Sequence, residues 1–382
     1  MMAGDTRVAL ISVPGYSGLD RAVERLAELL EYDPPVARVR VLIKPNLRSG
    51  NAPEKAVNTH PEVLRAVISF FQYRLARVVV GDSCGVYGYT GRCLSTSGMV
   101  QVIRDTHAEL LNFDKGTIVE EKVRGAVLKS IFLAREIRSC EYLVTVPKLK
   151  THSLMGMTGA LKNHVGFLPG GTKARLHMNY PDPEGFAEAV MDLNGHLPSH
   201  FTVMDAVVGM EGDGPARGTP IQTGLLIAGM DPAAVDRVAT LVMGLAPERV
   251  PLLAAAGRRG YTIDLTKITA LGEDPAAVAI QYRPARMKRT EALRWLYVLR
   301  NRHKERAVTL RIDKDRCSRC GYCAAICPVQ AIRLDPHPKF AKRRCIYCYS
   351  CQANCPSRAI TLRTAPWVTR MVRSQIDGGI DG

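Results

Sequence analysis

The chain has 382 residues, of which 46% are hydrophobic and 23% charged, and its formal net charge is +16. These values are ordinary for a globular protein with two or three domains and a sizeable core. No apolar run approaches the length of about 18 residues that a membrane-spanning helix needs. Residues 1–6 also lack the basic and apolar regions of a signal peptide. We therefore expect no transmembrane segment and a cytoplasmic location.

Short apolar runs alternate with helical patterns along the first two thirds of the chain. The runs predict strands at residues 7–13, 39–43, 76–80, 141–146, 201–206 and 225–229, and a strand pair within 109–135. Helical spacing predicts helices at residues 18–31, 61–75, 92–105, 154–166, 184–196, 232–244 and 247–256. Pro61 and Pro232 suit first helical positions, and Asp231 suits an N-cap. The alternation predicts an α/β domain with a doubly wound, mostly parallel sheet.

Polar side chains gather where the predicted strands end. They are Lys44, Asn46, Asp82, Lys148, Lys150, Lys162, Asn163, Glu211 and Asp213. Because loops at the carboxyl ends of parallel strands meet at one edge of a sheet, we expect one cleft there. The lysines and asparagines would bind an anionic small molecule through its carboxylate or phosphate. The three carboxylates would serve as acid and base, or hold a divalent cation.

Each of these residues has a simpler interpretation when it is taken singly. A lone lysine after a strand is commonly solvated, so we expect Lys148→Ala to weaken a bound ligand with little effect on stability. His152, His164 and His177 are individually more typical of structural histidines. The glycines near residues 81–91 and 156–162 match neither a dinucleotide-binding nor a Walker A motif.

The most specific pattern lies near the C-terminus, where the spacing C-x2-C-x2-C-x3-C-P occurs twice. The cysteines are Cys317, Cys320, Cys323 and Cys327 in the first half, and Cys345, Cys348, Cys351 and Cys355 in the second. This spacing is the bacterial pattern for [4Fe–4S] clusters, and the fourth cysteine of each half ligates the other cluster. We therefore predict two [4Fe–4S] clusters. Cluster I is bound by Cys317, Cys320, Cys323 and Cys355, and cluster II by Cys345, Cys348, Cys351 and Cys327.

Zinc sites and disulfide frameworks are the alternatives for these cysteines, but zinc sites rarely show this spacing and disulfides need an oxidising compartment. Residues 331–334 and 359–362 follow the two halves at matching offsets and predict short closing strands. The segment resembles the dicluster ferredoxins. We thus expect an α/β domain at residues 1–275, a basic connecting segment with a short helix at 276–306, a small α+β ferredoxin-like domain at 307–362 and a tail at 363–382.

The motifs of the α/β domain carry a second resemblance. They include Lys44-Pro-Asn46, Gly81-Asp82-Ser83, Lys148-Leu-Lys150-Thr-His152, Gly159-Ala-Leu-Lys162-Asn163 and Met210-Glu211-Gly-Asp213-Gly-Pro215. Their order and spacing resemble the family called domain of unknown function 362 over roughly residues 8–245. The resemblance implies an iron–sulfur protein without a settled reaction, and it supplies no substrate. Cys84 departs from this pattern, which has a small residue or proline after Gly-Asp-Ser. It is either a small residue buried in the core or, as a thiol beside the predicted cleft, a third redox group in addition to the two clusters.

Two functions of different classes fit these patterns. The first is an iron–sulfur oxidoreductase that passes single electrons between the clusters and an anionic substrate or cofactor in the lysine-rich cleft. The second is a non-catalytic electron carrier or metallocofactor maturation factor, whose basic surface docks an acidic redox partner. Nucleic-acid binding rests on charge alone, because no aromatic and basic stacking motif appears.

The doubled cysteine motif makes a direct prediction of metal content. Anaerobically reconstituted protein should hold about eight iron atoms per chain, because two cubanes contain four each. Iron and acid-labile sulfide analysis measures this. Stoichiometric zinc without labile sulfide would contradict the assignment.

Overall fold

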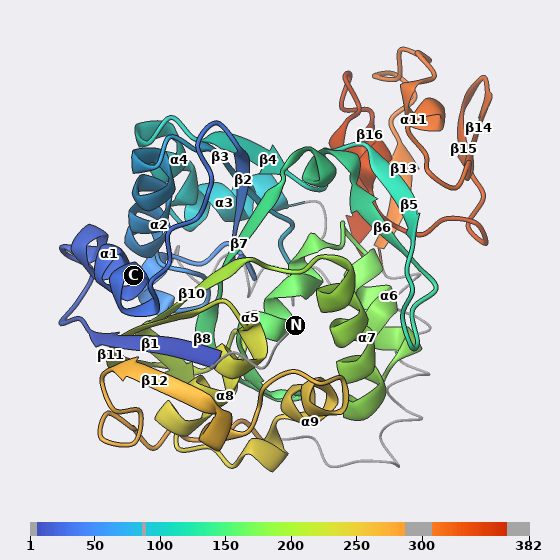
Figure 1. The fold of residues 1–382 in the computed structure, drawn as a ribbon. Coiled ribbons are helices and arrows are strands. Elements are labelled where there is room, and N and C mark those ends of the chain that lie inside the picture. Colours follow the sequence, from blue (N-terminus) through green and yellow to red (C-terminus); the bar gives the residue numbers. More distant parts are fainter. Residues whose placement is uncertain (1–5, 86–88, 287–307, 365–382) are drawn as a thin grey trace.

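The computed structural model describes residues 6–85, 89–286 and 308–364. A 10-stranded sheet forms the centre of the large domain, with its main strands in the order β12-β1-β11-β10-β7-β2-β3-β4 (Figure 1). The strands are β1 (Thr6–Ser12), β2 (Arg40–Pro45), β3 (Arg77–Asp82), β4 (Glu109–Asn112), β7 (Tyr142–Val146), β8 (Lys148–His152), β9 (Gly156–Thr158), β10 (Phe201–Glu211), β11 (Thr219–Gly229) and β12 (Ile268–Gly272). Most pairings are parallel, and β11 runs antiparallel to β1 and β10.

Helices cover both faces of this sheet. They are α1 (Leu19–Leu30), α2 (Pro61–Tyr73), α3 (Thr90–Thr96), α4 (Met99–Asp105), α5 (Ala160–Asn163), α6 (Thr172–Asn179), α7 (Pro183–His196), α8 (Pro232–Val242) and α9 (Pro251–Arg258). Successive strand residues enter opposite cores. Leu42 packs in the core formed with α5, α7, α8 and α9, whereas Val41 and Ile43 pack in the core formed with α1, α2, α3 and α4. The predicted doubly wound α/β class is therefore confirmed.

Several predicted helix boundaries are also confirmed. Helix α2 begins at Pro61 and helix α8 at Pro232. The Asp231 carboxylate accepts hydrogen bonds from the backbone N–H groups of Ala233 and Ala234, as an N-cap does. These local signals worked because proline at the first helical position leaves no hydrogen bond unmade.

Two predicted helices are wrong in part. The helix at 92–105 is divided into α3 and α4 at Gly98, whose φ of 78° lies in the left-handed region. The helix at 154–166 begins instead as strand β9, which pairs antiparallel with β8, and only then becomes the short α5. Gly156 makes this hairpin possible, because its φ is +68° and a Cβ there would lie 2.0 Å from the carbonyl oxygen of Arg249.

The strand pair predicted within 109–135 divides differently. β4 joins the edge of the main sheet, while β5 (Ile118–Lys122) and β6 (Ser130–Ala134) form a separate antiparallel hairpin. β10 and β11 each extend over 11 residues, longer than the strands predicted there. The apolar runs did not predict the full length of this antiparallel ladder, because the outer half of β11 contains the polar residues Thr219, Gln222 and Thr223.

The segment predicted as a connection, 276–306, is described as far as Arg286. Its described part lies on the α/β domain. Tyr282 is fully buried, its backbone N–H donates to the carbonyl of Met243, and its hydroxyl contacts that of Thr223. The helix predicted further along this segment and the tail helix predicted after residue 363 lie outside the described residues.

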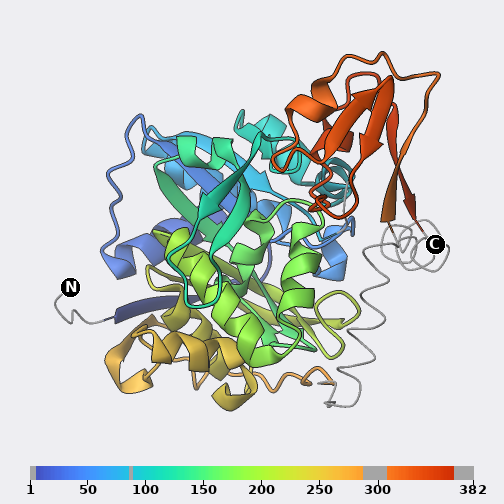
Figure 2. The same cartoon turned by 90° about the vertical axis from the view of Figure 1, so that its right-hand side faces the viewer.

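The small domain consists of two short antiparallel strand pairs and two short helices (Figure 2). β13 (Val308–Ile312) pairs with β16 (Ile360–Thr364), and β14 (Ile332–Asp335) pairs with β15 (His337–Phe340). The helices are α11 (Tyr322–Ala325) and α12 (Ser350–Ala353). β14 and β16 confirm the two predicted closing strands. The class of a small α+β domain following the α/β domain is confirmed as well.

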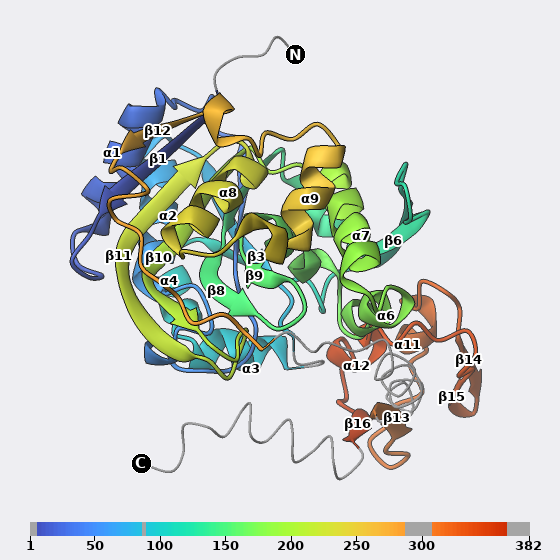
Figure 3. The same cartoon turned by 90° about the horizontal axis from the view of Figure 1, so that it is seen from below.

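The two domains meet where the loop before α12 lies against the start of α6 (Figure 3). The backbone N–H of Gly171 donates to the carbonyl of Tyr347 at 2.9 Å. Gly170 has a φ of +48°, and a Cβ at this position would lie 2.3 Å from the carbonyl oxygen of Cys348. The contact therefore requires glycine on the α/β side.

Replacing Gly170 should loosen this contact. In Gly170→Ala we expect faster hydrogen exchange in peptides that contain the Gly171 amide, because the added methyl group pushes the Tyr347–Cys348 backbone away. Gly195→Ala is the matched control, since a Cβ there has no neighbour within 4 Å and alanine favours a helix. Unchanged exchange at Gly171 in Gly170→Ala would contradict the importance of this contact.

Candidate functional site

The carboxyl ends of β2, β3 and β7 lie side by side, and the chain reverses its direction of travel across the sheet between β2 and β7. This is the topological switch point where parallel α/β sheets bind ligands. Lys44 ends β2 and Asp82 ends β3. The Lys44 Nζ lies 2.9 Å from an Asp82 carboxylate oxygen, and both side chains are 1% exposed. Burial lowers the pKa of Lys44 and raises that of Asp82, while their mutual attraction opposes both shifts.

Gly166 makes room for this ion pair. A Cβ at Gly166 would lie 2.4 Å from the Lys44 Nζ and 2.7 Å from an Asp82 oxygen. The second Asp82 oxygen is also held, because it accepts from the backbone N–H of Ser83 at 2.7 Å. The pair is thus fixed by the backbone around it and has little freedom to reorient.

Hydrogen bonds join three more of the predicted site residues to Lys44. The Lys44 Nζ donates to the side-chain oxygen of Asn163 at 3.1 Å, and the Lys150 Nζ donates to that of Asn46 at 2.7 Å. The Asn46 amide donates in turn to Asn163 at 3.5 Å. Lys44, Asn46, Lys150 and Asn163, which are far apart in sequence, therefore belong to one buried network.

Lys148 forms a second buried ion pair, with a residue that the sequence analysis did not select. Its Nζ lies 2.8 Å from an Asp205 oxygen, and neither side chain is exposed. Asp205 also accepts from the backbone N–H of His60, whose ring stacks on Tyr16 at 3.4 Å between centroids. The expectation of a solvated Lys148 is therefore wrong. The position of Asp205 inside a long strand gave no local sign of the pairing, because β8 reaches it only through parallel register.

Arg48, Lys150, Lys162 and His152 form what we call the cationic group. Burial lowers the pKa of Lys150 well below its usual range, and repulsion from Arg48, Lys162 and Lys148 adds to the shift. Burial and Arg48 lower the pKa of Lys162 to about 8. Burial and Lys162 hold the pKa of His152 well below its usual range, and its Nδ1 accepts from two backbone N–H groups. Sequence reasoning missed Arg48, which lies in the loop after β2 and belongs to none of the motifs considered.

The cationic group is poorly compensated within the described residues. An Arg48 nitrogen is buried there without a hydrogen-bond partner. Asp205 is the carboxylate that raises the pKa of Lys150, and its effect is smaller than that of the three cations. Uncompensated buried positive charge is costly, and an anion placed among these side chains would lower that cost.

The other two predicted carboxylates lie elsewhere. Glu211 accepts from the Arg283 side chain at 2.6 Å and from its backbone N–H at 2.8 Å, and this contact lowers the pKa of Glu211 although burial opposes it. Asp213 is exposed. Of the three predicted carboxylates, Asp82 is the one that binds a lysine of the network in the described part of the chain. Nor do the described residues include three His, Cys, Asp or Glu side chains grouped around a single ion.

A hydrogen-bonded path leads from this network toward the small domain. Lys173 donates to the Ser83 hydroxyl at 2.9 Å, and Ser83 donates to Asp114 at 2.6 Å. The same Asp114 oxygen accepts from the backbone N–H of Gly170 at 2.8 Å, and Gly170 lies against Cys348. Asp114 and Lys173 were not among the predicted site residues, because only the packing of α6 on the loop after β3 brings them there.

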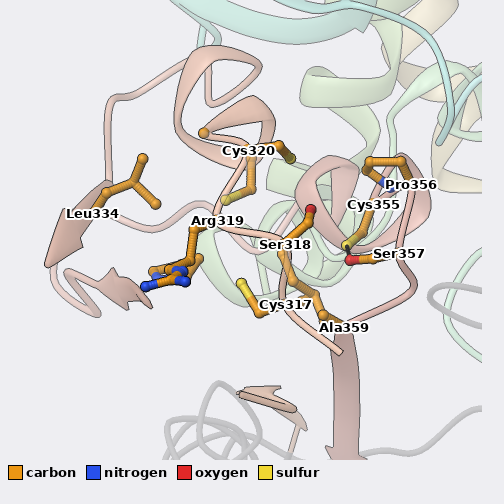
Figure 4. Close-up of a pocket in the computed structure, with 13 residues that line it drawn as sticks. Cys317, Ser318, Arg319, Cys320, Leu334, Cys355, Pro356, Ser357 and Ala359 are labelled. Atoms are coloured by element: carbon orange, nitrogen blue, oxygen red, sulfur yellow. Dashed lines mark hydrogen bonds between the residues drawn. The ribbon is translucent and has the colours of Figure 1, made fainter. Parts of the chain in front are cut away.

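The small domain holds a cavity that fits cluster I. Cys317, Cys320, Cys323 and Cys355 line it, together with Pro356 (Figure 4). These are the four cysteines that the motif spacing assigned to one cubane. Each thiolate of a cubane binds a different iron atom, so the four sulfurs surround a cluster and do not converge on one ion.

The remaining cysteines group as the motif predicts. The thiols of Cys348 and Cys351 interact electrostatically with those of Cys345 and Cys327, which is the set assigned to cluster II. Left-handed residues occur at matching positions of the two halves: Arg319 and Tyr347, Gly321 and Tyr349, Gln330 and Arg358. The backbone therefore winds in the same way around both sites, and the residues fit two [4Fe–4S] clusters.

The fold and these sites define an α/β protein with a ferredoxin-type iron–sulfur domain. A family model described as "Domain of unknown function (DUF362)" matches residues 41–240, and one described as a 4Fe-4S dicluster domain matches residues 316–359. The thylakoid-associated protein sll1697 of Synechocystis sp. is 30% identical over 231 residues, which is 60% of this chain and 71% of that protein. The chain thus belongs to the DUF362 family and carries a 4Fe-4S dicluster domain, as both resemblances implied.

Among solved structures, the lactate racemase apoprotein from Thermoanaerobacterium thermosaccharolyticum aligns with a TM-score of 0.41 and 11% identity. The alignment covers 64% of this chain and 58% of that one. Within the described residues, no helix is both long enough and apolar enough to cross a membrane.

The buried ion pair of Lys148 and Asp205 gives a stability prediction. Lys148→Met should lower the free energy of unfolding by about 3–5 kcal/mol, because Asp205 would keep a buried charge without its partner. The double variant Lys148→Met/Asp205→Leu should recover most of this loss. Denaturant unfolding monitored by circular dichroism measures both. Arg25→Met, which removes an exposed pair with Glu28, is the control and should change stability by less than about 1 kcal/mol. Equal stability of Lys148→Met and wild type would show that the ion pair with Asp205 does not stabilise the fold.

Proposed function

We propose that this protein is an iron–sulfur oxidoreductase that passes single electrons between its two [4Fe–4S] clusters and an anionic substrate or cofactor. The anion binds at the cationic group of the α/β domain. The observation that carries the proposal is the contact of Gly170 and Gly171 with the cluster II loop. Through Asp114 and Ser83, that contact reaches the residues of the switch point.

The proposal assigns different roles to the two clusters. Cluster II lies at the α/β domain, because Cys348 contacts Gly170 and its neighbour Tyr347 accepts from Gly171. Cluster I lies farther out, where Cys320 is exposed. Electrons therefore enter or leave the protein at cluster I and reach the α/β site from cluster II.

The anion is held by Lys162 and Arg48, with Lys150 and the Nε2 of His152 as further donors. Lys44 and Lys148 are neutralised by their own carboxylates, so their part is to hold the framework of the site. Asp82 is the candidate proton donor or acceptor, since burial raises its pKa and Lys44 holds it in place. Glu211 and Asp213 can take this role only for a ligand that reaches the outer end of β10. The proposal assigns no divalent cation to these two carboxylates.

The second candidate function, a carrier or maturation factor that docks an acidic redox partner, draws support from the surface near cluster I. Arg316, Arg319, Arg333 and Lys339 are exposed on the small domain and would meet such a partner. Both functions place the protein in a reducing compartment, and the cytoplasm is the location we propose.

Ligand analysis separates the two functions. Protein purified without oxygen should carry an anionic small molecule that native mass spectrometry detects, and Lys162→Met should lose it. Arg25→Met is a control of equal charge change on the surface and should keep it. If wild type carries no small molecule and binds neither inorganic phosphate nor acetate in calorimetry, the oxidoreductase proposal fails. This result would favour the function as an electron carrier or maturation factor.

The pKa of Lys162 gives the proposal a pH signature. Since Lys162 is charged below about pH 8, affinity for inorganic phosphate as a probe should fall as the pH rises from 7 to 9. Loss of one charge-assisted hydrogen bond corresponds to about 1.5–3 kcal/mol. Folding shows the opposite sign, because the pKa of Lys162 is lower in the folded than in the unfolded chain, so its contribution to stability rises between about pH 8 and 10. Lys162→Met should lose both effects, and a pH-independent affinity in wild type would contradict the assignment.

A further inference from the structure

Two cysteines outside the cluster motifs lie next to each other in the core of the α/β domain. Cys84 follows the end of β3, Cys93 lies on α3, and their Sγ atoms are 3.0 Å apart. Both side chains are essentially buried, at 0% and 1% exposed. A disulfide bond is about 2.05 Å long, so small side-chain rotations would close this distance.

We propose that Cys84 and Cys93 form a reversible dithiol–disulfide couple that exchanges electrons with the clusters of the small domain. The loop that carries Cys84 is held in place for this role. The backbone N–H of Cys84 donates to the Thr90 hydroxyl at 2.9 Å, and the Thr90 hydroxyl donates to Asp114 at 2.6 Å. The fixed backbone keeps Cys84 beside α3.

The surroundings favour thiol–disulfide chemistry at Cys84. The Lys173 Nζ donates to the Cys84 carbonyl at 3.0 Å and interacts electrostatically with the Cys84 thiol. The thiolate is the reactive form of cysteine, and a lysine ammonium group beside the sulfur can stabilise it during thiol–disulfide exchange. Contact with Cys84 and burial raise the pKa of Cys93, so Cys93 is the partner that keeps its proton in the reduced pair.

The pair lies between the cluster II contact and the cationic group. On one side, Ser83 and Asp114 connect Cys84 to Gly170, which touches Cys348. On the other side, the backbone N–H of Gly85 donates to the carbonyl of Arg48, and Arg48 acts electrostatically on Cys93. An electron acceptor in this position can take electrons from the clusters and deliver them next to the anion site.

The electron count fits the two clusters. The disulfide accepts two electrons and two protons, its S–S bond breaks, and two thiols form. The electrons come one at a time from two reduced [4Fe–4S] clusters, which return to the oxidised state, and the protons come from water. The reverse reaction closes the disulfide and reduces both clusters. The couple would convert the one-electron chemistry of the clusters into a two-electron step.

Thiol trapping of the holo-protein tests the proposal. Protein purified with oxygen should be denatured in acid, alkylated and mapped by peptide mass spectrometry, before and after reduction with dithiothreitol. We expect a Cys84–Cys93 cross-linked peptide that disappears on reduction, whereas Cys140 is alkylated in both samples. If Cys84 and Cys93 are alkylated as free thiols in the oxidised protein, the proposal is overturned.

An anaerobic reductive titration gives a second, independent readout. Wild type should take up about four electrons per chain, two in the clusters and two in the disulfide. Cys84→Ala and Cys93→Ala should take up about two with unchanged iron content, and Cys140→Ala should behave like wild type. An uptake of two electrons by wild type would refute the couple. The peptide map of wild type decides the question even if both variants fail to fold, and neither readout depends on the anion proposed above.

Discussion

Buried positive charge at the carboxyl edge of the sheet is the constraint on which this structure depends. The interior contains the side chains of Lys44, Lys148 and Lys150. An unpaired ammonium group is very costly there. The fold meets this cost with Asp82, Asp205 and the side-chain oxygen of Asn46. The partners come from distant parts of the chain, so the pairs also fix which strands lie next to each other.

The cationic group is the exception, because its buried positive charge is not matched by carboxylates in the described residues. Lys44 and Lys148 each have a carboxylate. Burial and the nearby Arg48 lower the pKa of Lys162 to about 8, and burial together with repulsion from Arg48 and Lys162 lowers the pKa of Lys150. A fold that pairs some buried lysines and leaves neighbouring cations uncompensated is suited to receive an anion. In the proposed site, the paired lysines form the framework and the cationic group binds the anion.

The contact between the domains connects this candidate site with the iron–sulfur domain. Gly170 and Gly171 allow the cluster II loop to approach the backbone, and Asp114 ties that point to the loop after β3. Asp82, the last residue of β3 before this loop, pairs with Lys44, and Cys84 within the loop lies next to Cys93. One short segment therefore contacts the hydrogen-bonded path from the small domain, the Cys84–Cys93 pair and the switch point. The proposed electron-transfer and anion-binding sites are thus neighbours.

The sequence by itself determined the features that depend on local spacing. The doubled cysteine motif identified the 4Fe-4S dicluster domain and predicted its crossed ligands. The alternation of elements identified the sheet class, because cubane spacing and strand or helix periodicity are short-range properties. Lys44, Asn46, Asp82, Lys150 and Asn163 were found because strand ends of a parallel sheet meet at one edge.

Only the tertiary structure decided which of these residues are partners. Asp205, Asp114, Lys173 and Arg48 joined the site, and Glu211 turned toward Arg283, through contacts between segments with no sequence relation. The burial of Lys148 and the approach of Cys93 to Cys84 likewise depend on how β8, β10 and α3 pack. Charge compensation and thiol proximity are properties of three-dimensional neighbours, and no spacing along the chain encodes them.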